Sequence, residues 1–340
     1  MYPMSIRIAI NGYGRIGRCI LRALYETGKR EKIEIVAINE LANLSSIAHL
    51  TQFDSIHGQF RGDVGCDGKN LLVNGDCIRM LCEPDIALLP WDEIGIDLVL
   101  ECSGSYVERD MAEQHLESGA GKVLFSCPAL PDVDATVVYG LNHHQLRPEH
   151  TIVSNASCTT NCIAHIIQLL HNTCTIECGT ITTTHSMMND QPVIDAYHNP
   201  DLRKNRSSGN SIIPVDTGLA RGLERIFPGL RGCFQAISLR VPTMNVSLMQ
   251  LTAQVASRVD AKELNGLFKE AAMGPLQGIL GYTDLPLVSC DFNHDSRSAI
   301  VDSSQTSVSG DCLVNVMAWF DNEWGYANRM LDTTMAMMGR

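Results

Sequence analysis

The sequence predicts a two-domain α/β protein. The first domain is built on a parallel sheet, and the second is an α+β domain with a mostly antiparallel sheet. The chain has 340 residues, more than one hydrophobic core usually serves. Strand and helix patterns alternate up to about residue 153, as in parallel sheets. Long β-branched segments with few helices between them follow, which favours antiparallel pairing.

The first domain is expected over residues 1–157 and opens with a β-α-β unit. An apolar strand, Ile6–Ile10, leads through a glycine-rich turn into a helix that includes Arg18–Tyr25. A second strand covers Ile33–Ile38. Further strands of this domain are predicted at 97–101, 122–126 and 136–139.

The second domain is expected over residues 158–321. It begins with a helix that contains the apolar run Ile163–Leu170. Its strands are predicted at 175–184, 234–240, 245–255 and 312–319, with a helix at 259–272. A polar stretch at 187–211 has no periodic pattern, and its length indicates a functional loop.

Composition excludes several classes of function. Hydrophobic residues make up 45% and charged residues 19%, as in a globular protein, and the net charge is −12. An acidic chain is not expected to bind nucleic acid or anionic membranes. The 13 cysteines include no C-x-x-C pair and no zinc spacing, so we expect no metal site. Free thiols, no signal-peptide core and no membrane-length apolar run predict a cytoplasmic protein.

The turn after the first strand has the pattern Gly12-x-Gly14-x-x-Gly17. It follows a strand, opens a helix and precedes a second strand with Glu40 at its end, which is the context of a Rossmann dinucleotide site. The pyrophosphate would meet the helix N-terminus, and Glu40 would accept hydrogen bonds from the ribose. Because its charge would repel a 2′-phosphate, NAD is expected rather than NADP. An empty glycine-rich turn is the alternative.

The stretch Ser154–Cys162 predicts a nucleophile. Cys158 lies among hydroxyl and amide residues at the start of a helix, where the backbone N–H groups favour a thiolate. His185, at the end of a β-branched strand, is the candidate base. A buried structural cysteine is the alternative, and that is the interpretation for Cys162.

These motifs resemble the glyceraldehyde-3-phosphate dehydrogenase family over essentially the whole chain. The segments that carry the resemblance are Ile10–Arg18, Phe53–Gly58, Ser154–Cys162, Arg240–Thr243 and Trp319–Tyr326. The resemblance implies NAD as cofactor, a homotetramer, and a C-terminal helix (322–340) that returns to the NAD-binding domain. It also implies that Cys158 attacks an aldehyde, with His185 as base, to give a thiohemiacetal and then a thioester.

The glycine fingerprint and the resemblance together give the expected site residues. For Arg15, phosphate contact and simple solvation both stay open. Those expected at the cofactor are Asn11, Gly12, Tyr13, Gly14, Arg15, Ile16, Gly17, Glu40 and Asn322. Those expected at the phosphorylated aldose substrate and the attacking phosphate are Ser157, Thr159, Lys204, Thr217, Gly218 and Arg240. For the basic cluster Arg203, Lys204 and Arg206, phosphate binding and a subunit contact both stay open.

Three positions depart from the glycolytic pattern. Met188 stands where a threonine is usual, Asp216 replaces another threonine, and Glu40 replaces an aspartate. These departures resemble the bacterial D-erythrose-4-phosphate dehydrogenase branch of the family. That branch implies oxidation of erythrose 4-phosphate to 4-phosphoerythronate, with water resolving the thioester, in pyridoxal-phosphate synthesis. The alternatives are a phosphorylating glyceraldehyde-3-phosphate dehydrogenase and a catalytically silent NAD-binding protein. A change in side-chain packing is an alternative explanation for Met188.

Overall fold

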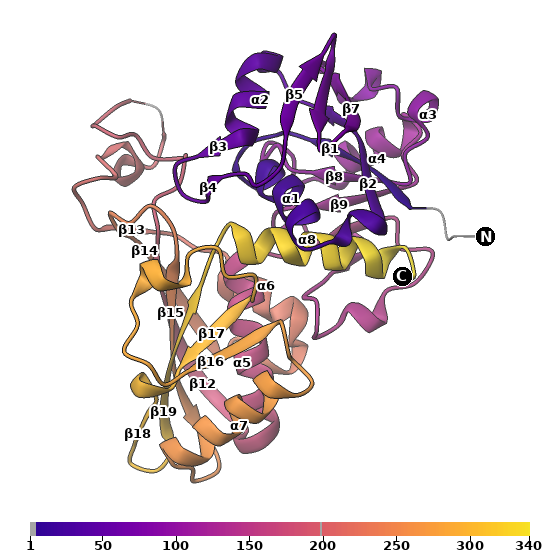
Figure 1. Cartoon of the computed structure of the whole chain (residues 1–340). Coiled ribbons are helices and arrows are strands. Elements are labelled where there is room, and N and C mark those ends of the chain that lie inside the picture. Colours follow the sequence, from indigo (N-terminus) through magenta and orange to yellow (C-terminus); the bar gives the residue numbers. More distant parts are fainter. Residues whose placement is uncertain (1–4, 198) are drawn as a thin grey trace. The chain divides into compact units, whose positions relative to one another are not determined.

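The computed structural model describes residues 5–197 and 199–340. The chain divides into two compact units: residues 1–157 with 327–340, and residues 158–326. The chain thus crosses from one unit to the other between Ser157 and Cys158. Figure 1 follows the elements along the chain.

The first unit is a nine-stranded sheet in the order β10-β11-β9-β8-β1-β2-β7-β6-β5. The strands from β10 to β7 pair in parallel, and β7-β6-β5 form an antiparallel meander. The strands are β1 (Ile6–Asn11), β2 (Ile33–Asn39), β5 (Val64–Asp67), β6 (Asn70–Val73), β7 (Asp76–Leu81), β8 (Leu98–Glu101), β9 (Lys122–Phe125), β10 (Ala135–Thr136) and β11 (Ile152–Ser154). The other elements are α1 (Arg15–Glu26), α2 (Leu44–Gln52), α3 (Trp91–Ile94), α4 (Arg109–Glu117) and the small hairpin β3 (Phe53–Asp54) and β4 (Gly58–Gln59).

The second unit is an eight-stranded sheet in the order β13-β14-β12-β15-β19-β17-β16, with β18 beside β19. It is mostly antiparallel, although β12 pairs with β14, and β16 with β17, in parallel. The strands are β12 (Ile176–His185), β13 (Ile213–Val215), β14 (Phe234–Arg240), β15 (Ser247–Val255), β16 (Leu280–Thr283), β17 (Ala299–Asp302), β18 (Ser307–Ser309) and β19 (Leu313–Phe320). The helices are α5 (Cys158–Cys174), α6 (Leu219–Ile226) and α7 (Ala261–Met273), and α8 (Trp324–Met337) follows the last strand.

Burial explains why the two sheets differ. Residues 8–11 of the central parallel strand β1 are all buried, so this strand reads as a continuous apolar run. In β15, buried and half-buried residues alternate along the whole strand, as expected of a sheet with one covered face. The predicted fold class is therefore confirmed: a Rossmann-type unit and an α+β unit with a mostly antiparallel sheet.

The strand predicted at 136–139 is wrong beyond Thr136. The Asn142 side chain accepts the Val138 N–H at 2.8 Å and donates to the Thr136 carbonyl at 2.9 Å. This side chain therefore captures the backbone groups that a continuing strand would need. The stretch 187–211 has no strand among its described residues, where only a short 3-10 helix, Leu202–Asn205, is regular.

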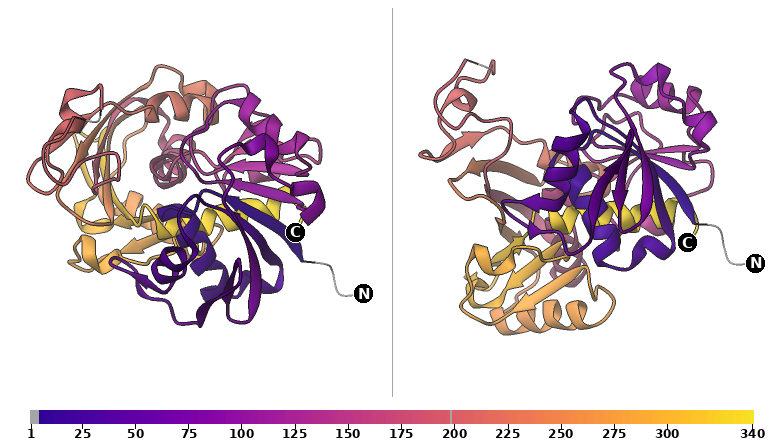
Figure 2. Two further views of the ribbon diagram at one scale, coloured as in Figure 1. Left: turned by 90° about the horizontal axis from the view of Figure 1, so that it is seen from above. Right: turned by 45° about the horizontal axis from the view of Figure 1, so that its top comes forward.

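Helix α8 starts in the second unit and continues into the first, where its last residues are held by side-chain contacts. Lys29 Nζ lies 2.7 Å from Asp332 Oδ1, and the Thr333 hydroxyl donates to Asn155 Oδ1 at 2.7 Å. In both views of Figure 2 the yellow helix lies beside the indigo elements of this unit. None of the helices in the part of the chain that the structure describes combines the length and apolar character that a membrane span requires.

Candidate active site

The turn between β1 and α1 has the geometry that its glycines predict. Gly12 has φ +86°, and a Cβ there would lie 2.4 Å from the Ser103 backbone. A Cβ on Gly17 would lie 2.6 Å from the Gly12 carbonyl oxygen, so this glycine lets α1 pack tightly against the turn. By contrast, a Cβ on Gly14 would meet nothing within 4 Å. The open space at Gly14, at the N-terminus of α1, is where a pyrophosphate would fit.

Glu40 closes the same turn. Its Oε2 accepts the Tyr13 N–H at 2.8 Å, and its Oε1 accepts the N–H groups of Leu41 and Ala42 at 2.8 and 3.3 Å. A carboxylate offers about four lone-pair positions, so three backbone donors leave room for one more strong hydrogen bond. Glu40 is thus held rigidly and can accept from a ribose hydroxyl.

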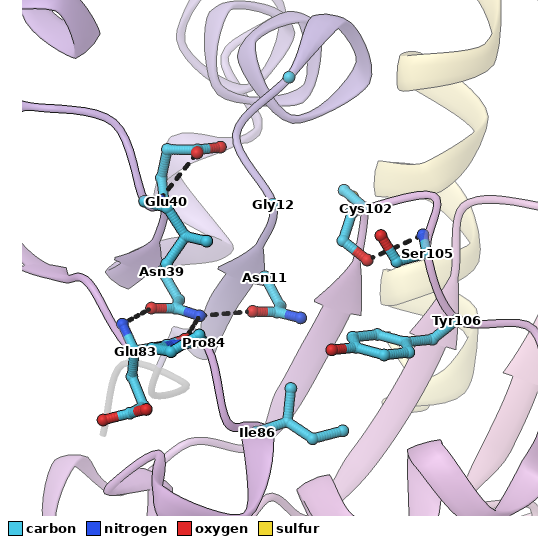
Figure 3. A pocket seen from close by; sticks show the side chains of 13 residues that line it. Asn11, Gly12, Asn39, Glu40, Glu83, Pro84, Ile86, Cys102, Ser105 and Tyr106 are labelled. Carbon is cyan, nitrogen blue, oxygen red and sulfur yellow. Dashed lines mark hydrogen bonds between the residues drawn. The ribbon is translucent and has the colours of Figure 1, made fainter. Parts of the chain in front are cut away.

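A cavity of about 260 Å³ lies at the carboxyl ends of β1, β2 and β8 (Figure 3). This is the edge of a parallel sheet where nucleotides bind. Its lining includes the predicted residues Asn11, Gly12, Gly14 and Glu40. It also includes residues that the sequence analysis missed: Asn39, Leu41, Glu83, Pro84, Ile86, Cys102, Ser103, Ser105 and Tyr106. The segment Cys102–Ser105, which directly follows the apolar strand β8, was the signal that could have revealed part of this wall.

The other residues expected at the cofactor have different surroundings. Arg15 forms an ion pair with Asp54. Burial alone would raise the pKa of Asp54, but Arg15 and two backbone N–H groups outweigh burial and lower this pKa. The Tyr13 ring is buried, and its hydroxyl lies 3.1 Å from the Thr51 hydroxyl, so Tyr13 offers the site its backbone rather than its side chain. Ile16 is half-buried in the first turn of α1.

In the second unit, Cys158 is the first residue of α5 and His185 the last of β12. The Cys158 Sγ lies 3.9 Å from His185 Nε2. His185 Nδ1 lies 2.8 Å from the Ser186 carbonyl oxygen, which can only accept, so Nδ1 carries the proton. The lone pair of Nε2 therefore faces the thiol, which is the tautomer a general base needs.

The expectation of a lowered thiol pKa is wrong for the resting site. Burial raises the pKa of Cys158 to about 11, although the Thr159 and Cys158 N–H groups and the charge of Arg240 oppose it. Burial, with Arg240 second, lowers the pKa of His185 to about 4. Both groups are neutral near pH 7. The N–H groups that oppose the effect of burial on the thiol are placed to stabilise negative charge when it develops.

Arg240 reaches this pair through strand register. β12 and β14 pair in parallel with His185 opposite Arg240, and an Arg240 Nη1 lies 3.2 Å from His185 Nδ1. Since both nitrogens carry hydrogen, this is a close contact of two donors rather than a hydrogen bond. Burial lowers the pKa of Arg240, but the group remains a cation suited to a phosphate.

Asn322 is oriented by two serines. The Ser186 N–H donates to Ser247 Oγ at 3.1 Å, and the hydroxyls of Ser247 and Ser186 each donate to Asn322 Oδ1 at 2.9 Å. Both hydroxyls occupy the carbonyl side of this buried amide. Its NH₂ side is therefore the one available to a ligand.

The remaining substrate candidates lie around the start of α5. Ser157 and Thr159 flank the thiol and are half-buried. A Cβ on Gly222 would lie 3.5 Å from the Thr160 hydroxyl, so α6 packs against the start of α5, and Thr217 and Gly218 directly precede α6. Lys204 Nζ lies 3.0 Å from Asp190 Oδ2, and Arg206 pairs with Asp195 at 2.9 Å, so both cations have their charge matched. Cys162 is fully buried, in keeping with a packing role.

The first unit holds a cavity suited to a nucleotide, and the second holds a thiol beside a histidine. Each is a feature of NAD-dependent oxidoreductases that act through a cysteine. Comparison with protein families agrees. Residues 6–109 match the family model described as glyceraldehyde 3-phosphate dehydrogenase, NAD binding domain, and residues 157–322 match its C-terminal domain. The chain belongs to the glyceraldehyde-3-phosphate dehydrogenase family. It is an oxidoreductase, and NAD is its cofactor.

Proposed function

We propose that this protein oxidises D-erythrose 4-phosphate to 4-phosphoerythronate, and that water releases the product from Cys158. The ion pair of Asp190 with Lys204 carries the proposal. It matches the charge of Lys204, in the stretch after His185, and leaves the half-buried Arg240 as the cation for a substrate phosphate. Met188 offers no hydrogen-bond donor from its side chain, and Asp216 adds an exposed acid before α6. Because Lys204 and Arg206 are both paired with acids, the loop attracts inorganic phosphate less strongly as the second nucleophile.

The residues supply the following chemistry. His185 Nε2 takes the thiol proton as sulfur attacks the aldehyde carbon, which gives a thiohemiacetal. The N–H groups near Cys158 stabilise the oxyanion. When bound, NAD would supply the acceptor for the hydride that leaves the substrate carbon. Loss of this hydride turns the thiohemiacetal oxyanion into a thioester, and His185 releases the thiol proton to solvent. Water then adds to the thioester on Cys158 as His185 accepts a proton from it, and His185 passes that proton to the sulfur when the acid leaves, which restores the thiol.

The alternative is a phosphorylating glyceraldehyde-3-phosphate dehydrogenase. Retention of Ser157, Thr159, Thr217 and Gly218 favours it, because these residues would hold inorganic phosphate in such an enzyme. A catalytically silent NAD-binding protein is disfavoured by the paired Cys158 and His185.

NADH formation from each sugar, with and without inorganic phosphate, separates these functions. We expect turnover of erythrose 4-phosphate without phosphate, and a slower reaction with glyceraldehyde 3-phosphate. A reaction that requires phosphate and prefers the three-carbon sugar would establish the alternative. Absence of NADH from either sugar would indicate the silent protein. Cys158→Ala should lose turnover and keep NAD binding.

The proposal includes the setting of the enzyme: a cytoplasmic homotetramer that acts in pyridoxal-phosphate (vitamin B6) synthesis and binds neither nucleic acid nor membrane. Exposed apolar side chains support self-association. Ile237 on β14 is 55% exposed, and Val193 and Ile194 in the 187–211 stretch are 80% and 76% exposed. Light scattering should give four times the chain mass for the parent protein and a smaller species for Ile237→Asp. A monomeric parent would contradict this part.

A further inference from the structure

A chain of buried polar side chains lies behind the nucleotide cavity and takes no part in the chemistry described above. It runs from Trp91 in α3 to His115 in α4 and then to Glu101 at the end of β8. Trp91 Nε1 lies 3.0 Å from His115 Nδ1, and His115 Nε2 lies 3.2 Å from Glu101 Oε2. All three side chains are at most 1% exposed. They cannot touch a ligand, so any effect on the cavity must pass through other residues.

The hydrogen bonds that join Trp91, His115 and Glu101 allow a single arrangement of their protons. The indole nitrogen of Trp91 can only donate, so His115 Nδ1 must accept and carries no proton. In the neutral ring the proton then sits on Nε2, and His115 donates to Glu101. One histidine therefore joins an indole to a carboxylate with no polar atom of its ring left unmatched.

Glu101 connects these hydrogen bonds to residues of the cavity wall. Its Oε1 accepts the N–H of Ser103 at 2.8 Å and also the Ser103 hydroxyl, while its Oε2 accepts from Asn11 Nδ2 at 2.6 Å. With His115, these donors use the acceptor capacity of the carboxylate. Both Ser103 and Asn11 line the nucleotide cavity.

The hydrogen-bond network continues along the cavity wall, as Figure 3 shows for Asn11, Asn39 and Glu83. Asn39 Nδ2 donates to Asn11 Oδ1 at 2.8 Å, and the Glu83 N–H donates to Asn39 Oδ1 at 2.9 Å. Asn11 and Ser103 therefore take their positions from one buried carboxylate, and Asn11 extends the network to Asn39 and Glu83. Ser103 is also the residue that a Cβ on Gly12 would strike, so its position limits the glycine turn.

We propose that His115 and Glu101 are positioning residues for NAD. His115 fixes the Glu101 carboxylate, and Glu101 holds Ser103 and Asn11 in the arrangement that the dinucleotide requires. Because these wall residues are already fixed before NAD binds, binding loses less free energy to ordering them. This inference concerns NAD binding alone, so it stands or falls independently of the sugar substrate.

Two variants of His115 form a matched test. In His115→Asn the shorter amide can still accept from Trp91 but cannot reach Glu101. In His115→Gln the longer amide can still donate to Glu101. The dissociation constant for NAD is measured by titration calorimetry, urea unfolding checks that each variant is folded, and NADH formation gives kcat at saturating NAD.

We expect the NAD dissociation constant to rise about tenfold in His115→Asn, the order that the loss of one buried hydrogen bond to a charged group produces. It should stay within about threefold of the parent in His115→Gln, and kcat at saturating NAD should change little in either variant, since only binding is affected. Equal dissociation constants in a folded His115→Asn and the parent would overturn the proposal. So would equal weakening in both variants, which would indicate a purely structural role.

If His115→Asn does not fold, Glu101→Gln tests the same link from the other side. Its amide keeps the volume but replaces one acceptor oxygen by a donor, which faces donors from Ser103, Asn11 or His115. We expect weaker NAD binding in the folded variant. A folded Glu101→Gln protein with the dissociation constant of the parent would overturn the proposal.

Discussion

Cys158 and His185 meet as two neutral groups, and this sets how the nucleophile is made. Burial favours the uncharged form of each, while Arg240 and the N–H groups at the start of α5 favour the thiolate. In the proposed reaction, the proton is therefore transferred during attack on the aldehyde rather than beforehand. Ser186 links this pair to Asn322, because its carbonyl fixes the His185 tautomer and its hydroxyl fixes the amide.

The pH dependence of Cys158 alkylation tests the neutral pair. Only the thiolate reacts with iodoacetamide, and a thiol whose pKa is raised to about 11 stays protonated up to that region. The rate at Cys158, followed by peptide mass spectrometry in the absence of NAD, should keep rising up to about pH 11. In urea-unfolded protein the alkylation rate should reach half of its plateau at about pH 8.5, the ordinary pKa of a cysteine. A plateau at neutral pH in the folded protein would show a preformed thiolate–imidazolium pair.

Ser247→Ala tests the orientation of Asn322. The change leaves the buried Ser186 N–H without its acceptor and removes one of two donors to Asn322. We expect a loss of about 1–3 kcal/mol in the free energy of unfolding, together with a higher KM for NAD. Ser238→Ala is the matched control, since Ser238 is also buried and lies on strand β14 of the same sheet. An equal effect of the two substitutions on KM would contradict the role of Ser247.

At the scale of elements, the β1–α1 turn shows how three glycines serve three different needs. Gly12 needs a positive φ and a close approach to Ser103, and Gly17 needs a close approach to the turn. Gly14 needs neither for folding, because the space beside it is open. Its lack of a side chain is explained by the ligand rather than by the fold.

Gly14→Ala should therefore separate binding from stability. A methyl group at Gly14 meets no protein atom within 4 Å, so the free energy of unfolding should fall by no more than about 0.5 kcal/mol. NAD binding should weaken at least about tenfold, because the methyl group occupies the path of the pyrophosphate. Gly28→Ala, at φ +72° with open space, is the control that should lose stability and keep NAD binding. Unchanged NAD affinity in Gly14→Ala would place the pyrophosphate elsewhere.

At the scale of the whole molecule, the last residues of the chain complete its first unit. Residues 327–340 group with residues 1–157, and Met330 and Leu331 are fully buried. The nucleotide-binding unit is therefore built from two segments that the second unit separates in the sequence.

Leu331→Ala should destabilise the nucleotide-binding unit. Truncation of a fully buried leucine costs about 2–5 kcal/mol. Thermal unfolding should show a lower midpoint that saturating NAD partly restores, because NAD binds the folded form of this unit. Met335→Ala, at a half-buried position of the same helix, should have a smaller effect. Equal effects of the two substitutions would argue against tight packing of Leu331.

Local patterns in the sequence determined the glycine turn, the acid at Glu40, the thiol at a helix start and the class of each sheet. These features depend on neighbours within a few residues, so spacing and residue type predict them. Tertiary structure alone decided that Arg240 stands beside His185, that Ser247 orients Asn322, and that Glu101 gathers donors from three segments. Each of these depends on strand register or on burial, which bring together residues far apart in the chain. Burial also reversed the expected shift of the thiol pKa, because the loss of solvation outweighs the helix N-terminus.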